Sequence, residues 1–133
     1  MIYLDGRPIA DRIKHELKEK VTGSSRSLRL AIVSVGNNSV SEKFIALKEV
    51  FARDIGVETR RYEFLETIST NELRDAMSDI VHEAHNDGVI VQLPLPSHID
   101  TQAVLNAVVA EKDVDVLSAR AVGNVQVGKS KIL

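Results

Sequence analysis

The chain has 133 residues, a formal net charge of −2 and no cysteine. Acidic and basic residues are interspersed throughout, so no basic stretch favours binding to nucleic acid or to an anionic membrane. The lack of cysteine excludes disulfides, thiolate zinc sites and a cysteine nucleophile. No apolar run approaches the roughly 18 residues that a membrane-spanning helix needs. The first residues do not resemble a signal peptide, so we expect a cytoplasmic protein with its own hydrophobic core.

The sequence predicts alternating helices and strands. Apolar residues at helical spacing predict the helices, and short apolar runs rich in Val and Ile predict the strands. In chain order we expect a helix over residues 9–21, a strand over 28–35, a helix over 39–55, a strand over 57–64, a helix over 70–83, a strand over 88–91 and a short helix over 101–109. This order predicts right-handed crossovers, and therefore a three-layer α/β/α sandwich with a mostly parallel sheet.

The expected helix over residues 39–55 carries an apolar stripe and a lysine. The stripe consists of Phe44, Leu47, Phe51 and Ile55. Lys48 follows Phe44 by one helical turn, so the amine and the aromatic ring share a face. An amine held between apolar walls favours its neutral form, which suits proton transfer.

The buried strand over residues 88–91 ends in an amide side chain and a proline-rich segment. Gln92 follows it directly, at the strand end where open α/β sheets bind ligands. The amide of Gln92 could hold the Lys48 amine and a substrate carbonyl together. These two segments predict a pocket in which Lys48 is the candidate proton-transfer group.

Three segments in order resemble the methylenetetrahydrofolate dehydrogenase/cyclohydrolases, the FolD-type enzymes of one-carbon metabolism. They read Val-Gly-Asn-Asn-Ser-Val-Ser-Glu-Lys-Phe-Ile-Ala-Leu-Lys over residues 35–48, Val-Gln-Leu-Pro-Leu-Pro over 91–96 and Lys-Asp-Val-Asp-Val over 112–116. The first residues also resemble the start of the family. The resemblance implies a tetrahydrofolate-binding catalytic domain over residues 1–116. It also implies that residues 117–133 are a loop leading towards an NADP-binding Rossmann domain absent from this sequence.

The resemblance implies roles for six residues. Lys48 and Gln92 would be catalytic, the amide orienting the amine. The substrate-binding residues would be Phe44, Leu93, Pro94 and Asp115, with the Asp115 carboxylate holding the ring amide and amine of the pterin. Family members oxidise 5,10-methylenetetrahydrofolate with NADP and hydrolyse the methenyl product to 10-formyltetrahydrofolate.

The resemblance also bears on cofactors and partners. No Gly-x-Gly-x-x-Gly fingerprint occurs, so we expect no cofactor-binding residue in this chain, although the family uses NADP. We expect no metal site, and a small-molecule folate as the substrate. Family members form homodimers largely through the second lobe, so we expect this chain to be monomeric.

Several residues depart from the family pattern. Phe44 replaces a tyrosine, which keeps ring stacking and removes the phenolic hydrogen bond. Val116 replaces a glycine, which changes the backbone conformations that are easily adopted there. Ser118 and Ala121 replace a histidine and an asparagine.

Each candidate residue also has a purely structural interpretation. Lys48 could be a solvated surface lysine, and Gln92 could cap backbone groups at the strand end. Asp113 and Asp115 could be ordinary loop carboxylates, and Pro94 could simply end the strand. The alternative function is a non-catalytic folate- or partner-binding α/β module descended from the same domain.

Two further patterns suggest other chemistry. Residues 123–130 match the P-loop pattern Gly-x-x-x-x-Gly-Lys-Ser, but the preceding segment makes a poor strand and only three residues follow. His82 and His85 have a spacing compatible with two metal ligands, but no third ligand is nearby, so we expect them to face solvent near a helix end.

Overall fold

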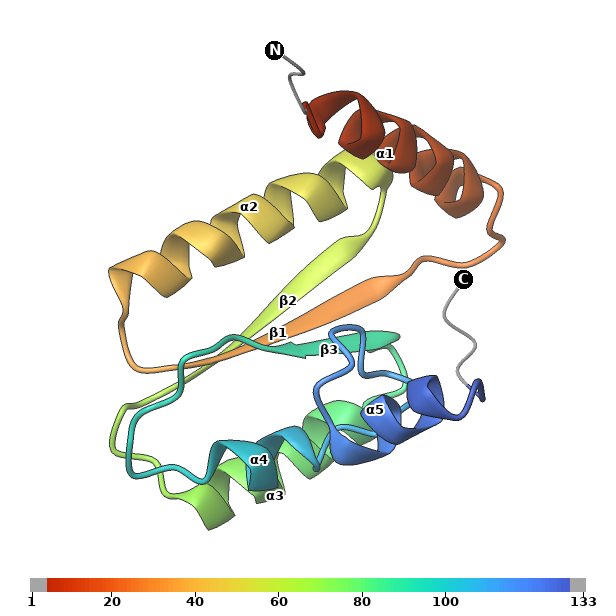
Figure 1. The fold of residues 1–133 in the computed structure, drawn as a ribbon. Coiled ribbons are helices and arrows are strands. Elements are labelled where there is room, and N and C mark those ends of the chain that lie inside the picture. The colour runs from red at the N-terminus through yellow and green to blue at the C-terminus, as the bar shows by residue number, and fades with distance from the viewer. Residues whose placement is uncertain (1–4, 130–133) are drawn as a thin grey trace.

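The computed structural model describes residues 5–129 and confirms an α/β fold with a parallel sheet (Figure 1). The strands lie in the order β2-β1-β3. Helix α2 covers one face of the sheet with α1 packed beside it, and α3, α4 and α5 lie on the other side (Figure 1). The elements are α1 Arg7–Thr22, β1 Arg29–Val35, α2 Ser39–Ile55, β2 Glu58–Phe64, α3 Thr70–His82, β3 Gly88–Val91, α4 Thr101–Leu105 and α5 Ala119–Gln126.

The central strand β1 fixes the register of the sheet. Leu30 pairs with Thr59 of β2 on one side and with Gly88 of β3 on the other. The main core lies between the sheet and helices α3 and α4, because alternate residues of a strand point to the same face. Its buried members are Ala31, Val33, Val35, Leu73, Met77, Ile80, Val81, Val89, Val91, Ile99, Val104, Leu105 and Val108.

Local signals mark where α2 begins and ends and where α3 begins. The Asn38 side chain accepts hydrogen bonds from the first amides of α2, and Gly56 ends that helix in the left-handed conformation at φ 88°. Helix α3 begins with a capping box in which Ser69 and Glu72 bond each other's backbone amides.

Three of the four residues of the apolar stripe of α2 are exposed. Phe44, Leu47 and Phe51 are 54%, 66% and 39% exposed, and only Ile55 is buried. The buried face of α2 consists of Ser41, Ile45, Ala52 and Ile55. Two of these residues are small, and the larger Phe44, Leu47 and Phe51 lie outside this buried face.

Two predictions about the carboxyl-terminal third also need correction. The short helix expected over residues 101–109 ends at Leu105. Residues 117–133, expected as a loop, contain helix α5, which Ser118 caps by accepting a hydrogen bond from the Ala121 amide. Within residues 5–129, no helix is both long and apolar enough to cross a membrane.

Candidate functional site

A direct hydrogen bond joins the two candidate catalytic side chains. Lys48 Nζ donates to Gln92 Oε1 at 2.8 Å. Lys48 lies in the middle of α2 and is half-buried, and Gln92 directly follows β3 and is 8% exposed. The pair therefore connects the helical layer to the carboxyl end of a buried parallel strand, where this type of sheet binds ligands.

The orientation of Gln92 is fixed from both sides. Its backbone amide donates to the Val33 carbonyl at 2.8 Å, which continues the pairing of β3 with β1. Its Nε2 donates to the Leu93 carbonyl at 2.8 Å, so Oε1 is turned towards Lys48. One N–H of the amide remains available to a ligand, because each side-chain amide carries two donors.

The residue next to Lys48 ties α2 to the sheet. Glu49 and Glu42, two turns apart on α2, both accept hydrogen bonds from Arg61 of β2, at 2.6 Å and 2.7 Å for Glu49 and 2.9 Å for Glu42. The hydrogen bond from Arg61 holds the pKa of the Glu49 carboxyl below its ordinary value. This ion-pair group fixes the helix segment that carries Lys48.

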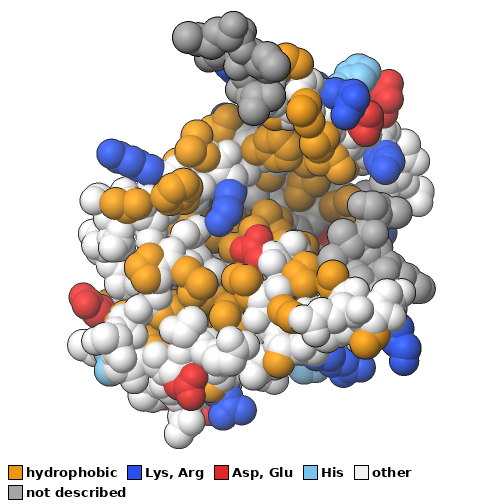
Figure 2. All heavy atoms as spheres, in the orientation of Figure 1, with side chains coloured by type: hydrophobic (Ala, Val, Ile, Leu, Met, Phe, Trp, Pro, Cys, Tyr) orange, Lys and Arg blue, Asp and Glu red, His pale blue; other side chains and the backbone are white. Residues whose placement is uncertain are grey.

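The other predicted substrate-binding residues lie on the two segments that the pair connects. Phe44 is one turn before Lys48 and presents an exposed ring. Leu93 is half-buried and Pro94 is exposed, and the peptide bond between them is cis. On the face shown in Figure 2, apolar side chains gather around a hollow, and a basic and an acidic side chain lie near its centre.

Asp115 lies on a separate loop beside β3. Asp113 forms a parallel bridge with Val89, and the Val116 amide closes a turn onto the Asp113 carbonyl at 3.3 Å. Asp115 is exposed within this turn. Among the described residues, no hydrogen bond or ion pair engages its carboxylate, and none joins it to Lys48 or Gln92. The structure thus brings Lys48 and Gln92 into contact, with Asp115 on the neighbouring loop.

The positions that depart from the family pattern have structural roles in this fold. Val116 adopts φ 56°, a left-handed conformation that is a genuine outlier for a β-branched residue. Ser118 is 1% exposed and caps α5, and Ala121 is buried inside that helix. A serine just before an apolar helical run is a recognisable N-cap signal, and it could have predicted α5.

The structure does not support the P-loop or the histidine metal site that the sequence patterns suggest. Residues 123–126 are helical, whereas a P-loop needs an open glycine loop before a helix; Ser130 lies outside the described residues. His82 is exposed and its Nδ1 lies 2.7 Å from the Ser78 carbonyl, and His85 lies beside Glu83. Within residues 5–129, no three His, Cys, Asp or Glu side chains gather as metal ligands would.

Comparison with known protein families gives one match that covers most of the chain. Residues 4–115 match the family described as tetrahydrofolate dehydrogenase/cyclohydrolase, catalytic domain. The matched region contains α1 to α4, the Lys48–Gln92 pair and Asp115.

Curated relatives show the same similarity along the chain. The bifunctional protein FolD of Chlamydia trachomatis serovar L2 is 37% identical, and the alignment covers 97% of this chain and 45% of the relative. FolD of Halothermothrix orenii is 40% identical over 84% of this chain and 41% of its own length. The chain therefore spans less than half the length of the curated relatives it matches.

Solved structures of similar enzymes superimpose closely. The bifunctional enzyme FolD from Campylobacter jejuni matches with a TM-score of 0.89 and 32% identity, over 96% of this chain and 46% of that enzyme. The FolD from Trypanosoma brucei, solved with NADP cofactor and an inhibitor, matches with a TM-score of 0.86 and 28% identity, over 98% and 46%. The fold of residues 5–129 is thus that of about half of each enzyme.

Proposed function

Because this chain belongs to the tetrahydrofolate dehydrogenase/cyclohydrolase family through its catalytic domain, we propose that it binds tetrahydrofolate derivatives and hydrolyses 5,10-methenyltetrahydrofolate to 10-formyltetrahydrofolate. The observation that carries this proposal is the hydrogen bond from Lys48 Nζ to Gln92 Oε1 at the carboxyl end of β3. It places one titratable amine at the strand end with a fixed amide as its partner.

The hydrolysis needs one group that first accepts and then returns a proton. Water adds to the carbon that bridges N5 and N10 of the methenyl cation, and the Lys48 amine accepts one proton from that water. The bond from the bridging carbon to N5 then breaks. Lys48 returns its proton to N5, the hydroxyl proton passes to solvent, and the carbon becomes the formyl group on N10. One water is consumed and one proton is released, so atoms and charge balance.

Other residues of the pocket bind and orient the substrate. Gln92 holds the Lys48 amine in place, and its remaining N–H can donate to a carbonyl of the pterin. The Asp115 carboxylate, which no described residue engages, can accept hydrogen bonds from the ring amide and the exocyclic amine. The exposed ring of Phe44 offers a stacking surface for the substrate.

The turn between β1 and α2 does not fit the pyrophosphate of a dinucleotide such as the NADP that the Trypanosoma brucei relative contains. The strand-to-helix turn after β1 has a single glycine, Gly36, followed by Asn37 and Asn38. The Asn38 side chain already accepts hydrogen bonds from the Val40 and Ser41 amides, at 2.9 Å and 3.1 Å. Backbone amides at the start of a helix are the groups that bind a phosphate, and here the Asn38 side chain already bonds them. The proposed chemistry therefore concerns the folate pocket alone.

A non-catalytic folate-binding module is the second candidate function, and Phe44 is the observation that favours it. A phenyl ring can stack on the substrate but cannot donate the hydrogen bond of the family tyrosine. Such a module would bind the folate with Lys48 serving only as a hydrogen-bond donor. Both candidate functions include folate binding, but only the enzyme would convert the bound folate.

The test follows the disappearance of the methenyl chromophore on addition of the protein. Replacement Lys48→Met should lower the enzyme-dependent rate by about 10² to 10⁴, the usual contribution of general acid–base catalysis. Lys43→Met is the matched control, because Lys43 is an exposed lysine on the same helix without a hydrogen bond or ion pair among the described residues. If the parent chain does not hydrolyse the methenyl compound faster than the spontaneous reaction, the enzymatic function is excluded. If Lys48→Met and Lys43→Met give equal rates, Lys48 is excluded as the proton-transfer group.

A further inference from the structure

The carboxyl-terminal end of α3 is closed by side chains rather than by a glycine. Glu83 follows the helix at φ −58° and ψ 118°, outside the left-handed conformation of a glycine cap. The last carbonyls of a helix need donors from elsewhere. Asn86 Nδ2 donates to the Ile80 carbonyl at 2.9 Å, and Lys112 Nζ donates to the Val81 carbonyl at 2.7 Å and the Glu83 carbonyl at 3.1 Å.

The backbone of Lys112 is bound to the sheet at the same point. Its carbonyl accepts a hydrogen bond from the Val89 amide at 2.7 Å, and the next residue, Asp113, forms a bridge with Val89. Gly88 allows this close approach, because a Cβ there would lie 2.7 Å from Val114 Cγ1. Lys112 is therefore held by its side chain to α3 and by its main chain to β3.

The loop that follows Lys112 is tied down again at its other end. The Asp113 carboxylate accepts hydrogen bonds from the amides of Leu117 at 3.1 Å and Ser118 at 2.8 Å. The segment between these two attachments contains Asp115 and the left-handed Val116. Strained backbone of this kind persists only where its surroundings determine the conformation.

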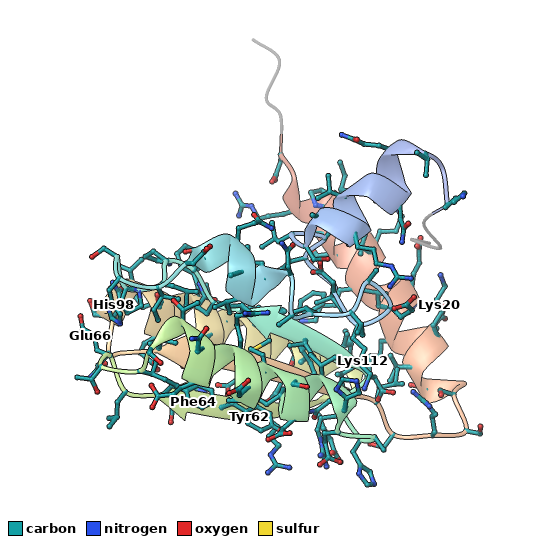
Figure 3. All side chains as sticks on the ribbon, turned by 90° about the horizontal axis from the view of Figure 1, so that it is seen from below. Lys20, Tyr62, Phe64, Glu66, His98 and Lys112 are labelled. Atoms are coloured by element: carbon teal, nitrogen blue, oxygen red, sulfur yellow. The ribbon has the colours of Figure 1, made fainter. Side chains whose placement is uncertain are left out.

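We infer that Lys112 is the positioning residue of the folate pocket: its ammonium group anchors the Asp115 loop to the end of α3. The inference rests on the proposed function, in which Asp115 holds the pterin. A cation is favourable at the carboxyl end of a helix, where the backbone carbonyls carry partial negative charge. Figure 3 shows Lys112 beside α3, whereas Lys20 lies on α1.

Replacing Lys112 distinguishes a lysine that positions the Asp115 loop from a lysine that only stabilises the fold. Lys112→Met keeps an unbranched side chain that is one atom shorter, and it removes the charge and the donors. It should release the loop without opening the sheet, so that amide hydrogen exchange at Leu117 and Ser118 becomes about tenfold faster while amides of β1 exchange at the parent rate. Ligand affinity should fall because Asp115 is no longer held, whereas kcat should change little, since a ground-state binding contact contributes equally in the transition state.

The experiment measures amide exchange in the full chain and its affinity for 5-formyltetrahydrofolate, with KM and kcat from the methenyl assay. Lys112→Met should weaken binding and raise KM by roughly tenfold. Lys112→Arg keeps a cation that can donate to both carbonyls and should restore the parent values. Lys20→Met is the control, because Lys20 is exposed and has no hydrogen bond or ion pair among the described residues.

Each result decides between the inference and its rivals. Parent-like exchange at Leu117 and Ser118 in Lys112→Met would overturn the inference, as would equally accelerated exchange in β1, which would mean general destabilisation. Local release of the loop without a change in affinity or KM would also overturn it. Failure of the parent chain to bind the folate would refute the proposed function and with it the pocket role of Lys112, while the exchange data would still report whether the loop depends on Lys112.

Discussion

Lys48 Nζ and Gln92 Oε1 lie 2.8 Å apart, although the two residues belong to a surface helix and to the end of a buried strand. The amide that accepts this hydrogen bond is itself fixed by its bond to the Leu93 carbonyl. Helix α2 and the end of β3, which are separated in the chain by β2 and α3, therefore meet in one contact whose geometry is already fixed. This contact requires both the parallel order of β1 and β3 and the position of α2 on the sheet.

Val116 is expected to limit the stability of the loop that carries Asp115. Left-handed backbone costs a β-branched residue roughly 1–2 kcal/mol, and glycine avoids that cost at an entropic penalty of its own. Val116→Gly should therefore raise the free energy of unfolding by about 0.5–1 kcal/mol, measured by chemical denaturation. Val127→Gly, at an exposed residue with φ −94°, should give no gain. Equal changes in the two variants would contradict the strain assigned to Val116.

We expect a side chain at Gly88 to destabilise the protein, because the Asp115 loop packs against this glycine. An alanine Cβ would lie 2.7 Å from Val114 Cγ1 and 3.3 Å from Leu30 Cδ1, so the loop or the strand must move. Gly88→Ala should lower the free energy of unfolding by about 1–3 kcal/mol, as overpacking does. Gly123→Ala is the matched control in α5, where nothing lies within 4 Å, and it should stabilise the protein by up to about 1 kcal/mol. A neutral Gly88→Ala would show that the loop is not packed against β3.

The Glu49–Arg61 ion pair predicts a pH-dependent contribution to stability. The hydrogen bond from Arg61 lowers the pKa of Glu49 from its ordinary value of 4.5, so the folded state favours the ionised carboxyl. A depressed pKa stabilises the fold above the unfolded-state value, and the contribution is lost as the pH falls through the folded-state value. Glu49→Gln should therefore destabilise the chain at pH 7 by less than about 1 kcal/mol, and the difference from the parent should shrink below about pH 4.5.

The control for this prediction is Glu111→Gln, at an exposed glutamate that has no hydrogen bond or ion pair among the described residues. Denaturation curves of the parent and both variants at pH 7 and at pH 3 make the comparison. A difference between Glu49→Gln and the parent that stays constant over this pH range would contradict the ion-pair explanation.

Much of the fold could be predicted from the sequence because its signals are local. Alternating helical and strand-like runs predicted the parallel sheet, and in the structure Asn38, Gly56 and the Ser69–Glu72 pair set helix ends through local contacts. Helix α5 was missed because it is short and has a glycine within it, although Ser118 was a readable cap. The periodicity of α2 predicted an amphipathic helix, but periodicity does not show which neighbour covers each side, and three residues of the apolar stripe are exposed.

The candidate site could be predicted only as far as its segments have recognisable patterns. The strand end at Gln92 and the helical turn from Phe44 to Lys48 predicted a shared pocket, and the structure places Lys48 and Gln92 in contact. The anchoring of Lys112 on α3 could not be predicted, since it depends on two segments about 30 residues apart meeting in space. The roles of Lys48, Gln92 and Asp115 in catalysis and binding stay predictions.

The affinity of the chain for a stable tetrahydrofolate tests the central claim most directly. Calorimetric titration with 5-formyltetrahydrofolate should show one saturable site in the parent, at least tenfold weaker binding in Asp115→Asn, and parent-like binding in the Lys43→Met control. Loss of a charge-assisted hydrogen bond to the pterin is the reason for the expected effect. A flat titration for the parent chain, or unchanged affinity in Asp115→Asn, would contradict the proposed folate pocket.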